Sequence, residues 1–542
     1  MVLARRLRAR LLGCAALCMV VSAYAENIAA QSQPTRSPDS HQVATNAKLA
    51  ERRDVALFRQ RVEGALSAPG PDKGLWGMLV TNAATGEVLY ALHADNYFAP
   101  ASDAKLFTTA LALATLGPEY RIRTTISTFG TLDETGLLRG DLILNGAGDA
   151  NLSNRKFPYE KKTERQGPPE KVLAELADAV AARGVKEITG GVIADDSLFQ
   201  PERFPSGWTM DDTLWPYGAA VSAIAINDNT FTLEIEPGER EGDAAVFTVE
   251  PSVDFYTIEN LTRTGGHGSE EKLAVAREPG SHLIRVSGAI PAGAQPRRLS
   301  IANEEPAEYA AMLLARLLET RGIRIDGAAR ARHAGEPALF GADRPPETIL
   351  AEHTSLPLAE DIRLVNKSSL NLHAELLLLL AAHERAGATT REEALKFAAD
   401  FIKTAGIADG DVILHDGSGL SRGDLVTPRA IVQMLHYAAA QPWGELYRSS
   451  LPVAGEDGTL SERMKNTTAA GHVLAKTGTI EHVNSLSGYA TTSRGAHLIF
   501  SILGNNNDLR AQAADTVLDA IAVAMLEELG PAQQPKRGKL RK

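Results

Sequence analysis

The chain has 542 residues, of which 44% are hydrophobic, and its formal net charge is −11 at pH 7. An acidic chain has no electrostatic basis for holding a nucleic-acid backbone, so we expect no nucleic-acid partner. The length exceeds the roughly 250–300 residues that one hydrophobic core supports, and it predicts two to three domains.

The first 25 residues have the features of an export signal. Four arginines lie between positions 5 and 10, an apolar run covers 11–21, and the small-x-small sequence Ala23-Tyr24-Ala25 follows. This order predicts that the leader is removed and that an exported, periplasmic protein begins near Glu26. A rival interpretation places a lipid anchor on Cys14, although few apolar residues precede it. Because Cys14 and Cys18 both lie in the leader, we expect no disulfide and no thiolate metal site after cleavage.

The next part of the chain alternates helical and β patterns. A spacer over 26–47, rich in Gln, Ser, Pro, Thr and Asn, precedes an expected helix over 48–67. Runs at 77–82 and 87–92 predict a β-hairpin. The apolar stretch 106–116 then predicts a buried helix whose first turn holds Ser102.

Between about 121 and 350 the pattern changes to short β runs separated by Gly and Pro, with one helical pattern at 170–183. We interpret this region as an inserted β-rich domain that carries a smaller α/β domain. After 351 helices return, notably at 370–386. Three β runs at 473–478, 486–490 and 497–503 predict antiparallel strands, and an amphipathic helix over 513–529 packs on them.

The predicted divisions follow this reading. They are 1–25 for the signal peptide, 26–47 for the spacer, 48–122 and 351–530 for the two parts of a catalytic domain, 123–150 and 241–350 for the two parts of the inserted β-rich domain, 151–240 for the nested α/β domain, and 531–542 for a basic tail. The tail is a candidate for weak contact with a membrane surface or wall polymer, and its ordinary interpretation is a solvated end.

Ser102 and Lys105 form the first of three short motifs. On a helix, residues three apart share a face, so the Ser102 hydroxyl and the Lys105 amine can meet. A lysine among apolar groups can lose its proton and activate a serine nucleophile. Other Ser-x-x-Lys patterns occur at 153–156 and 269–272, but neither opens an apolar helix. The ordinary interpretation is a capping serine followed by a surface lysine.

Ser369 and Asn371 form the second motif, directly before a helical run. A hydroxyl on a loop can relay a proton to a leaving amine, and a side-chain amide can hold the backbone of a substrate. A plain helix cap is the ordinary interpretation.

The third motif is Lys476-Thr477-Gly478-Thr479, in a β-like run. Gly478 allows close backbone approach, so an edge strand here can pair with an extended peptide while the ammonium and hydroxyls bind a carboxylate. A glycine turn with exposed polar residues is the ordinary interpretation. The three motifs together make the trio that lysine-assisted serine acyl transfer uses. The histidines are scattered and no His-Glu-x-x-His occurs, so we expect no metal and no cofactor.

At this point the chain resembles the type-4 penicillin-binding proteins, the D-alanyl-D-alanine carboxypeptidase/endopeptidase family. The resemblance covers most of residues 50–525 and includes the stretches 98–102, 140–149, 366–375, 416–422 and 485–489. The long interval between Ser102 and Ser369 also resembles this family, whose members carry large insertions there. Two positions depart from it: Leu370 replaces a common Asp, and Ala150 stands where Pro is usual.

The resemblance implies an α/β fold. This is a penicillin-recognising serine transpeptidase-like domain, with a five-stranded antiparallel sheet flanked by helices and interrupted by the insertion. It implies that Ser102 is the acylated nucleophile, Lys105 its base, Ser369 a proton relay and Asn371 a partner of substrate and lysine. It further implies that Lys476, Thr477, Gly478 and Thr479 bind the substrate, with the backbone N–H groups of Ser102 and Thr479 as an oxyanion hole.

The implied partners are peptidoglycan stem peptides that end in D-Ala-D-Ala, and β-lactam antibiotics. Two alternatives stay open on the sequence: a serine β-lactamase built on the same trio, and a non-catalytic protein that binds the cell wall. The balance between carboxypeptidase and endopeptidase activity cannot be read from these residues.

Overall fold

The structure, a computed structural model, describes residues 52–156, 164–165, 167–337, 339 and 345–530. The predicted leader, the spacer, the start of the first helix at 48–51 and the basic tail lie outside the described residues. The predicted first helix is seen as α3 (Arg53–Leu66).

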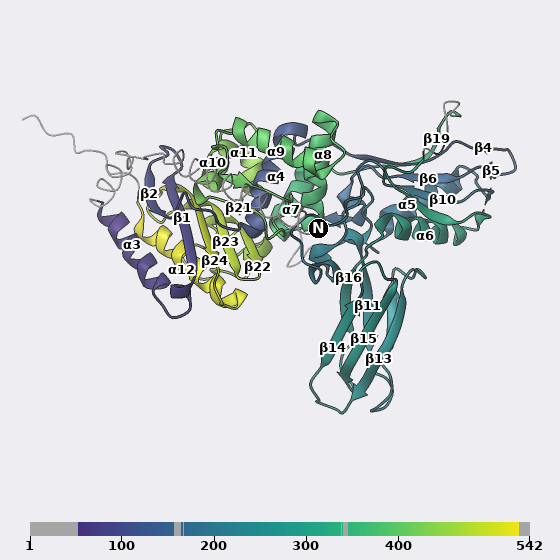
Figure 1. Ribbon diagram of the computed structural model, residues 1–542, viewed down its shortest axis with the longest axis horizontal. Helices are drawn as coiled ribbons and strands as arrows, with labels where there is room; N and C mark the ends of the chain where they lie inside the picture. The colour runs from purple at the N-terminus through teal and green to yellow at the C-terminus, as the bar shows by residue number, and fades with distance from the viewer. Residues whose placement is uncertain (1–51, 157–163, 166, 338, 340–344, 531–542) are drawn as a thin grey trace, which may run out of the picture. The chain divides into compact units, whose positions relative to one another are not determined.

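The sheet next to the Ser102 turn has five strands in the order β2-β1-β24-β23-β22, and every neighbouring pair is antiparallel (Figure 1). Its strands are β1 (Leu75–Asn82), β2 (Val88–Leu92), β22 (Val473–Ile480), β23 (Val483–Thr491) and β24 (His497–Asn505). The hairpin and the three late strands were all predicted from the sequence. β22 stands at one edge of the sheet, where Leu474 bridges to Val453 and the rest of the strand has no neighbouring strand among the described residues.

Helices cover both faces of this sheet. α10 packs against β1 and β24, and α12 packs against β23 on the opposite face (Figure 1). Because both faces are covered, β23 and β24 are buried along nearly their whole length, which explains their continuous apolar runs. The helices of this part are α4 (Lys105–Leu116), α7 (Leu358–Ser368), α8 (Asn371–Ala386), α9 (Arg391–Thr404), α10 (Pro428–Ala439), α11 (Gly444–Ser450) and α12 (Ala511–Glu528).

The insertion contains a second five-stranded sheet, in the order β18-β10-β6-β3-β19. β6, β10 and β18 run parallel, and β3 and β19 are antiparallel to their neighbours. The strands are β3 (Arg123–Thr128), β6 (Leu142–Asn145), β10 (Val192–Asp195), β18 (Ala329–Arg332) and β19 (Thr348–Thr354). The helices α5 (Lys171–Ala182) and α6 (Pro306–Glu319) pack on it and bury a shared apolar core.

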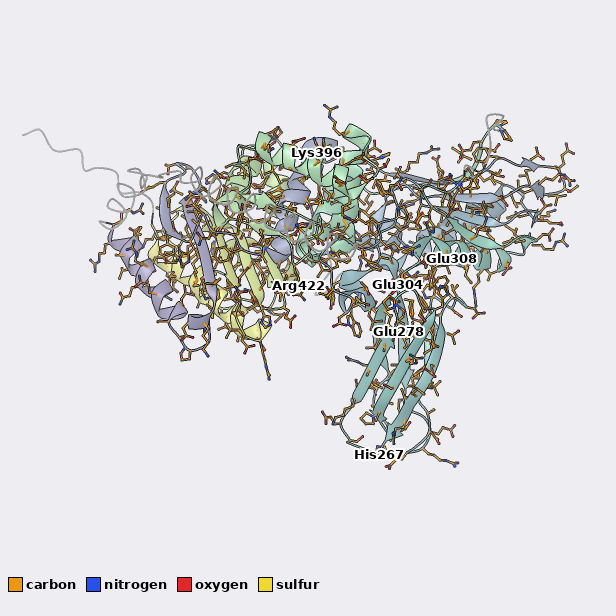
Figure 2. All side chains as sticks on the ribbon, viewed as in Figure 1. His267, Glu278, Glu304, Glu308, Lys396 and Arg422 are labelled. Carbon is orange, nitrogen blue, oxygen red and sulfur yellow. The ribbon has the colours of Figure 1, made fainter. Side chains whose placement is uncertain are left out.

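The segment 230–302 forms two three-stranded sheets, β12-β11-β16 and β13-β15-β14 (Figure 1). Their strands are β11 (Thr230–Glu236), β12 (Val246–Glu250), β13 (Thr257–Gly265), β14 (Lys272–Arg277), β15 (Leu283–Pro291) and β16 (Arg297–Ala302). Arg277 connects the two sheets at one end, since its Nη2 lies 3.0 Å from Oε1 of Glu304, which Figure 2 labels. Its side chain is almost fully buried.

The strands not yet named are short. They are β4 (Thr131–Leu132), β5 (Leu137–Arg139), β7 (Arg155–Lys156), β8 (Glu164–Arg165), β9 (Glu187–Ile188), β17 (Arg324–Ile325), β20 (Val412–Ile413) and β21 (Leu425–Val426).

This strand pairing corrects the predicted division of the insertion at 150 and 240. β6, assigned to the β-rich part, pairs with β10 of the expected α/β domain, and β10 pairs with β18 beyond it. The α/β sheet is therefore the outer unit, and the purely β segment 230–302 is inserted into it, the reverse of the predicted nesting. Parallel strands pair across long crossovers, so local β patterns do not reveal which strands share a sheet.

Within the described ranges, no helix combines the length and apolar character needed to cross a membrane.

Candidate active site

Ser102 lies in the 3₁₀ turn η2 (Ala101–Ala104), directly before the buried helix α4. The sequence predicted a first helical turn, and the structure tightens that turn into 3₁₀ geometry. Ala101 has a left-handed backbone, with φ of 48°, which redirects the chain just before the serine. The ordinary interpretation of the motif is wrong, because Lys105 is not a surface residue: its exposed fraction is 0%.

The Lys105 amine sits among three oxygens. Its Nζ lies 2.8 Å from Ser102 Oγ, 2.6 Å from Asn371 Oδ1 and 2.6 Å from the Ser418 carbonyl. A neutral amine has two N–H groups and one lone pair. It can donate to the amide and carbonyl oxygens, which only accept, and present its lone pair to the Ser102 hydroxyl. The same three contacts would also satisfy an ammonium, so the choice of the neutral, base form depends on the electrostatic surroundings.

Electrostatics favour that form. Burial lowers the pKa of Lys105 well below its ordinary value, and the positive charge of Lys476 lowers it further. The carboxyls of Asp416, Glu375 and Asp103 oppose this fall. A lysine in this setting can hold a free lone pair near neutral pH.

Ser369 and Asn371 lie at the junction of α7 and α8. Ser369 caps α7 in a left-handed conformation, with φ of 59°, and Asn371 opens α8. Asn371 Nδ2 donates to the Tyr217 carbonyl at 2.7 Å, which turns Oδ1 toward Lys105. Leu370, at the position where the resembled family commonly has Asp, is the N-cap of α8 and makes no side-chain capping bond there.

Lys476 reaches across from the edge strand β22. Its Nζ donates to Ser369 Oγ at 2.9 Å and to the Thr477 carbonyl at 2.7 Å, and its exposed fraction is 0%. Burial lowers its pKa, and the negative charge of Asp103 opposes that fall. Thr477 Oγ1 lies 2.7 Å from Thr459 Oγ1, and Thr479 is exposed.

Gly478 brings β22 against the nucleophile turn. A Cβ at this position would lie 2.2 Å from Ser485 Oγ and 2.8 Å from both the Ser102 nitrogen and the Pro100 carbonyl. Any side chain would push strand and turn apart, so glycine is required there.

Four of the predicted site residues, Ser102, Ser369, Asn371 and Thr479, line a cavity of about 610 Å³, whereas Lys105, Lys476, Thr477 and Gly478 are not among its lining residues. Its walls come from the nucleophile turn, the α7–α8 junction, β22 and the insertion. The lining residues are Ser102, Thr209, Asp211, Asp212, Tyr217, Ser369, Asn371, Gly419, Leu420, Arg422, Thr479, Ile480 and Glu481. The cavity is large enough for a short peptide end.

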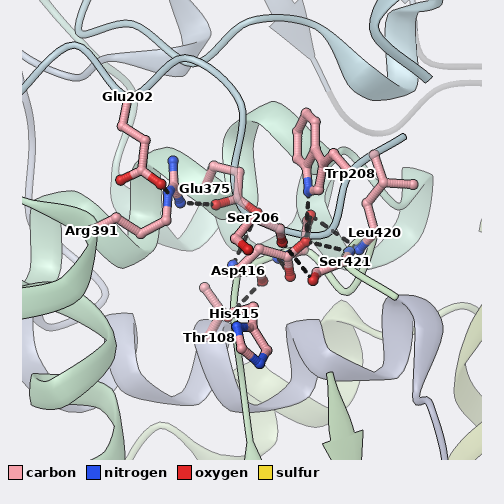
Figure 3. A network of polar contacts seen from close by, with 12 residues as sticks. Thr108, Glu202, Ser206, Trp208, Glu375, Arg391, His415, Asp416, Leu420 and Ser421 are labelled. Atoms are coloured by element: carbon pink, nitrogen blue, oxygen red, sulfur yellow. Dashed lines mark hydrogen bonds and ion pairs between the residues drawn. The ribbon is translucent and has the colours of Figure 1, made fainter. Parts of the chain in front are cut away.

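A buried polar network holds the loop that offers the Ser418 carbonyl to Lys105 (Figure 3). Asp416 accepts hydrogen bonds from the backbone N–H groups of Ser418, Gly419 and Ser421, at 3.1, 2.6 and 2.7 Å. Trp208 Nε1, from the insertion, donates to its other side at 2.8 Å. The stretch 416–422 entered the sequence reading only as part of a resemblance, and its local sequence does not show that a backbone carbonyl there faces Lys105.

Glu375 extends the network behind this loop. It accepts from Arg391 Nη1 and, at 2.9 Å, from the Gly417 N–H, and both charged side chains are buried. Burial raises the pKa of Glu375 to about 7, with Arg391 working against the rise.

A second ionic cluster lies on the same helix as Asn371. His373 is fully buried, with Nδ1 2.6 Å from Asp361 Oδ1 and Nε2 3.4 Å from Asp228 Oδ1. Burial works to lower its pKa, but Asp361 and Asp228 together raise it to about 9. The charged imidazolium thus joins α7, α8 and the insertion.

His373→Gln will destabilise the protein more at pH 6 than at pH 10. The folded-state pKa lies above the unfolded value near 6.5, so the stabilisation is complete below about pH 6.5 and is lost as pH rises through 9. We expect a loss of roughly 2–3 kcal/mol at pH 6. Urea unfolding at both pH values measures it, with the exposed His472→Gln as control. An equal loss at both pH values would contradict a stabilising positive charge on His373.

Among the described residues, no group of three or more His, Cys, Asp or Glu is arranged to hold a metal ion.

Comparison with known proteins agrees with this geometry. The model of the D-Ala-D-Ala carboxypeptidase 3 (S13) family matches residues 58–527. A D-alanyl-D-alanine carboxypeptidase of Actinomadura sp. (strain R39) is 34% identical over 90% of this chain and 86% of its own length. The carboxypeptidase DacB of Haemophilus influenzae is 25% identical over 79% of this chain and 85% of its own.

The fold has a solved counterpart. The crystal structure of Haemophilus influenzae penicillin-binding protein 4 superposes with a TM-score of 0.73 at 24% identity, over 86% of this chain and 98% of that one. A second structure of that protein, in complex with a β-lactam, has a TM-score of 0.68. The resemblance seen in the motifs is confirmed, and the chain belongs to the D-Ala-D-Ala carboxypeptidase 3 (S13) family.

Proposed function

We propose that this enzyme hydrolyses the bond between the two terminal D-alanines of peptidoglycan stem peptides through an acyl-enzyme on Ser102, and that it also cuts D-Ala cross-links between stem peptides. One observation carries the proposal: the buried Lys105 Nζ lies 2.8 Å from Ser102 Oγ, with two acceptor oxygens fixing its other hydrogens. The family match supports the reaction class.

Acylation begins when Ser102 Oγ attacks the carbonyl carbon of the penultimate D-Ala. As the new C–O bond forms, the hydroxyl proton moves to Lys105 Nζ. The developing oxyanion is held by the backbone N–H groups of Ser102 and Thr479. The close approach of β22 to the nucleophile turn at Gly478 supports this assignment.

The scissile C–N bond breaks next. The proton that Lys105 took from Ser102 passes through the hydroxyl of Ser369 to the leaving amine, and D-Ala departs. The terminal carboxylate of the substrate is bound by Lys476 with the hydroxyls of Thr477 and Thr479, while the extended peptide pairs with the outer edge of β22 beyond Leu474. Water then hydrolyses the ester on Ser102 and restores the serine.

We further propose that penicillin acylates Ser102, since the related Haemophilus influenzae protein binds a β-lactam. The chain acts in the periplasm after removal of its leader. Its basic tail contacts anionic lipid or wall polymer weakly.

Mass spectrometry of purified muropeptides tests the function. Wild-type protein will remove one D-Ala from monomers that end in D-Ala-D-Ala and will split cross-linked dimers, and Ser102→Ala will do neither. Ser269→Ala, an exposed serine of another Ser-x-x-Lys pattern, is the matched control and will behave as wild type. Trimmed monomers beside intact dimers would rule out the endopeptidase activity.

The two alternative functions give different results in the same preparation. A β-lactamase would turn over fluorescent penicillin rapidly, whereas a peptidase keeps a long-lived adduct on Ser102. A non-catalytic wall-binding protein would leave all muropeptides intact and bind them equally well after Ser102→Ala.

A further inference from the structure

Asp103 is a buried carboxyl in the nucleophile turn to which the acyl-transfer steps above give no role. It lies between Ser102 and Lys105 in η2, and its exposed fraction is 0%. Within the described part of the chain, neither carboxyl oxygen has a hydrogen-bond partner that meets ordinary geometry. A carboxylate so placed is costly unless nearby positive charge offsets the loss of water.

Three neighbouring elements enclose the turn that carries Asp103. The η2 turn packs against β22, β23 and α4. On β23, Ser485 Oγ donates to the Pro100 carbonyl and Ser487 Oγ donates to Ser501 Oγ, both at 2.9 Å, while both hydroxyls lie close enough to Asp103 to influence its pKa.

The ionisable groups that interact with Asp103 come from three elements. They are Lys105 of α4, Lys476 of β22 and Tyr447 of α11. Tyr447 is buried and donates its hydroxyl proton to the Leu106 carbonyl at 2.8 Å. Burial raises the pKa of Asp103, and the hydroxyls of Ser487 and Ser485 and the charges of Lys476 and Lys105 oppose that rise.

The two lysines depend on Asp103 to different degrees. Lys105 is also influenced by Asp416 and Glu375, both more strongly than by Asp103. Lys476 lies on β22, which packs directly against the η2 turn of Asp103, and for this lysine Asp103 is the acidic group that opposes the effect of burial on its pKa. The chemistry needs Lys105 as a free amine and Lys476 as an ammonium, although both are fully buried.

We propose that Asp103 is a positioning residue whose carboxylate is the buried counter-ion of Lys476, keeping that lysine an ammonium while Lys105 acts as the neutral base. With one carboxylate, one ammonium and one amine, these three side chains carry no net charge. The inference rests on the proposed function, because it assigns the two lysines opposite protonation states.

Asp103→Asn keeps the side-chain shape and removes the charge. Second-order rates of acylation by a fluorescent penicillin, measured from pH 5 to 10, should show the basic limb of the profile moved to lower pH by about one unit or more. At the acidic end, where Asp103 itself is protonated, the two rates should agree within about twofold. A purely structural role would lower the rate at every pH and leave the limbs in place.

Asp95→Asn is the matched control. It removes the same charge from a half-exposed carboxylate that pairs with Arg429, and its pH profile should equal that of wild type. A folded Asp103→Asn protein with an unshifted basic limb overturns the inference, while the proposed function stands if wild type still cleaves D-Ala-D-Ala.

If Asp103→Asn does not fold, Asp103→Ser gives the same comparison. If neither variant folds, carbon-13 NMR of aspartate-labelled wild-type protein decides the question. A carboxyl of Asp103 that stays protonated throughout the pH range of activity overturns the inference, and one that ionises within or below that range supports it.

Discussion

Lys105→Ala will abolish acylation of Ser102, with a fall of at least about 10³-fold in the second-order rate. The reason is that Lys105 Nζ lies 2.8 Å from Ser102 Oγ, where a neutral amine can take the hydroxyl proton. Alanine leaves Asn371 Oδ1 and the Ser418 carbonyl in place, and both are acceptors that cannot activate a hydroxyl in this way.

Lys476→Arg will behave differently. It keeps a positive charge while placing it differently, so residual acylation remains and the basic limb of the pH profile changes. Stopped-flow rates with a fluorescent penicillin over moderate pH measure both variants. Lys272→Ala, in another Ser-x-x-Lys pattern and 71% exposed, is the control and should acylate normally. Near-normal acylation by Lys105→Ala would overturn the assigned mechanism, even though the family assignment would stand.

Glu375→Ala will destabilise the fold by about 3–5 kcal/mol, the usual cost of leaving a buried charge without its partner. Arg391 would lose the carboxylate that accepts from its Nη1 while only 3% of its side chain is exposed. The Gly417 N–H would lose its acceptor as well. Because Gly417 precedes Ser418, acylation should also slow in the protein that remains folded.

Urea unfolding at pH 8 measures this loss. Glu202→Ala is the control, because Glu202 is 47% exposed at 3.6 Å from the same arginine, and it should cost less than about 1 kcal/mol. The double variant Glu375→Leu/Arg391→Leu should recover most of the stability, since no lone buried charge remains. A double variant no more stable than Glu375→Ala would show that the ion pair is not what stabilises this region.

Much of the fold around the nucleophile could be predicted from the sequence. Antiparallel neighbours such as β1 and β2, or β22 and β23, are joined by short turns, so local patterns contain the pairing. The insertion could not be resolved in this way. β10 pairs with β6 and β18, which come from distant parts of the chain, and their patterns carry no mark of that partnership.

The candidate active site could likewise be predicted only in part from the sequence. Side-chain chemistry pointed to Ser102, Lys105, Asn371 and Lys476. The structure brings the first three into contact, and Lys476 Nζ donates to Ser369 Oγ. Their assigned roles stay predictions until the variants are measured. The contributions of Ser418 and Tyr217 are main-chain carbonyls, which any residue type can provide, so the sequence offered no signal for them.

The bond from Asn371 to the Tyr217 carbonyl has a consequence for how this enzyme can diverge. Because the insertion reaches the amide through its backbone, almost every substitution at position 217 preserves the contact, and comparison of residue types there would miss its importance. What can alter the contact is the path of the chain, which depends on loop lengths and packing elsewhere in the insertion. Lineages that remodel this insertion can therefore move the Asn371 amide and change the basicity of Lys105, while every residue of the three motifs stays unchanged.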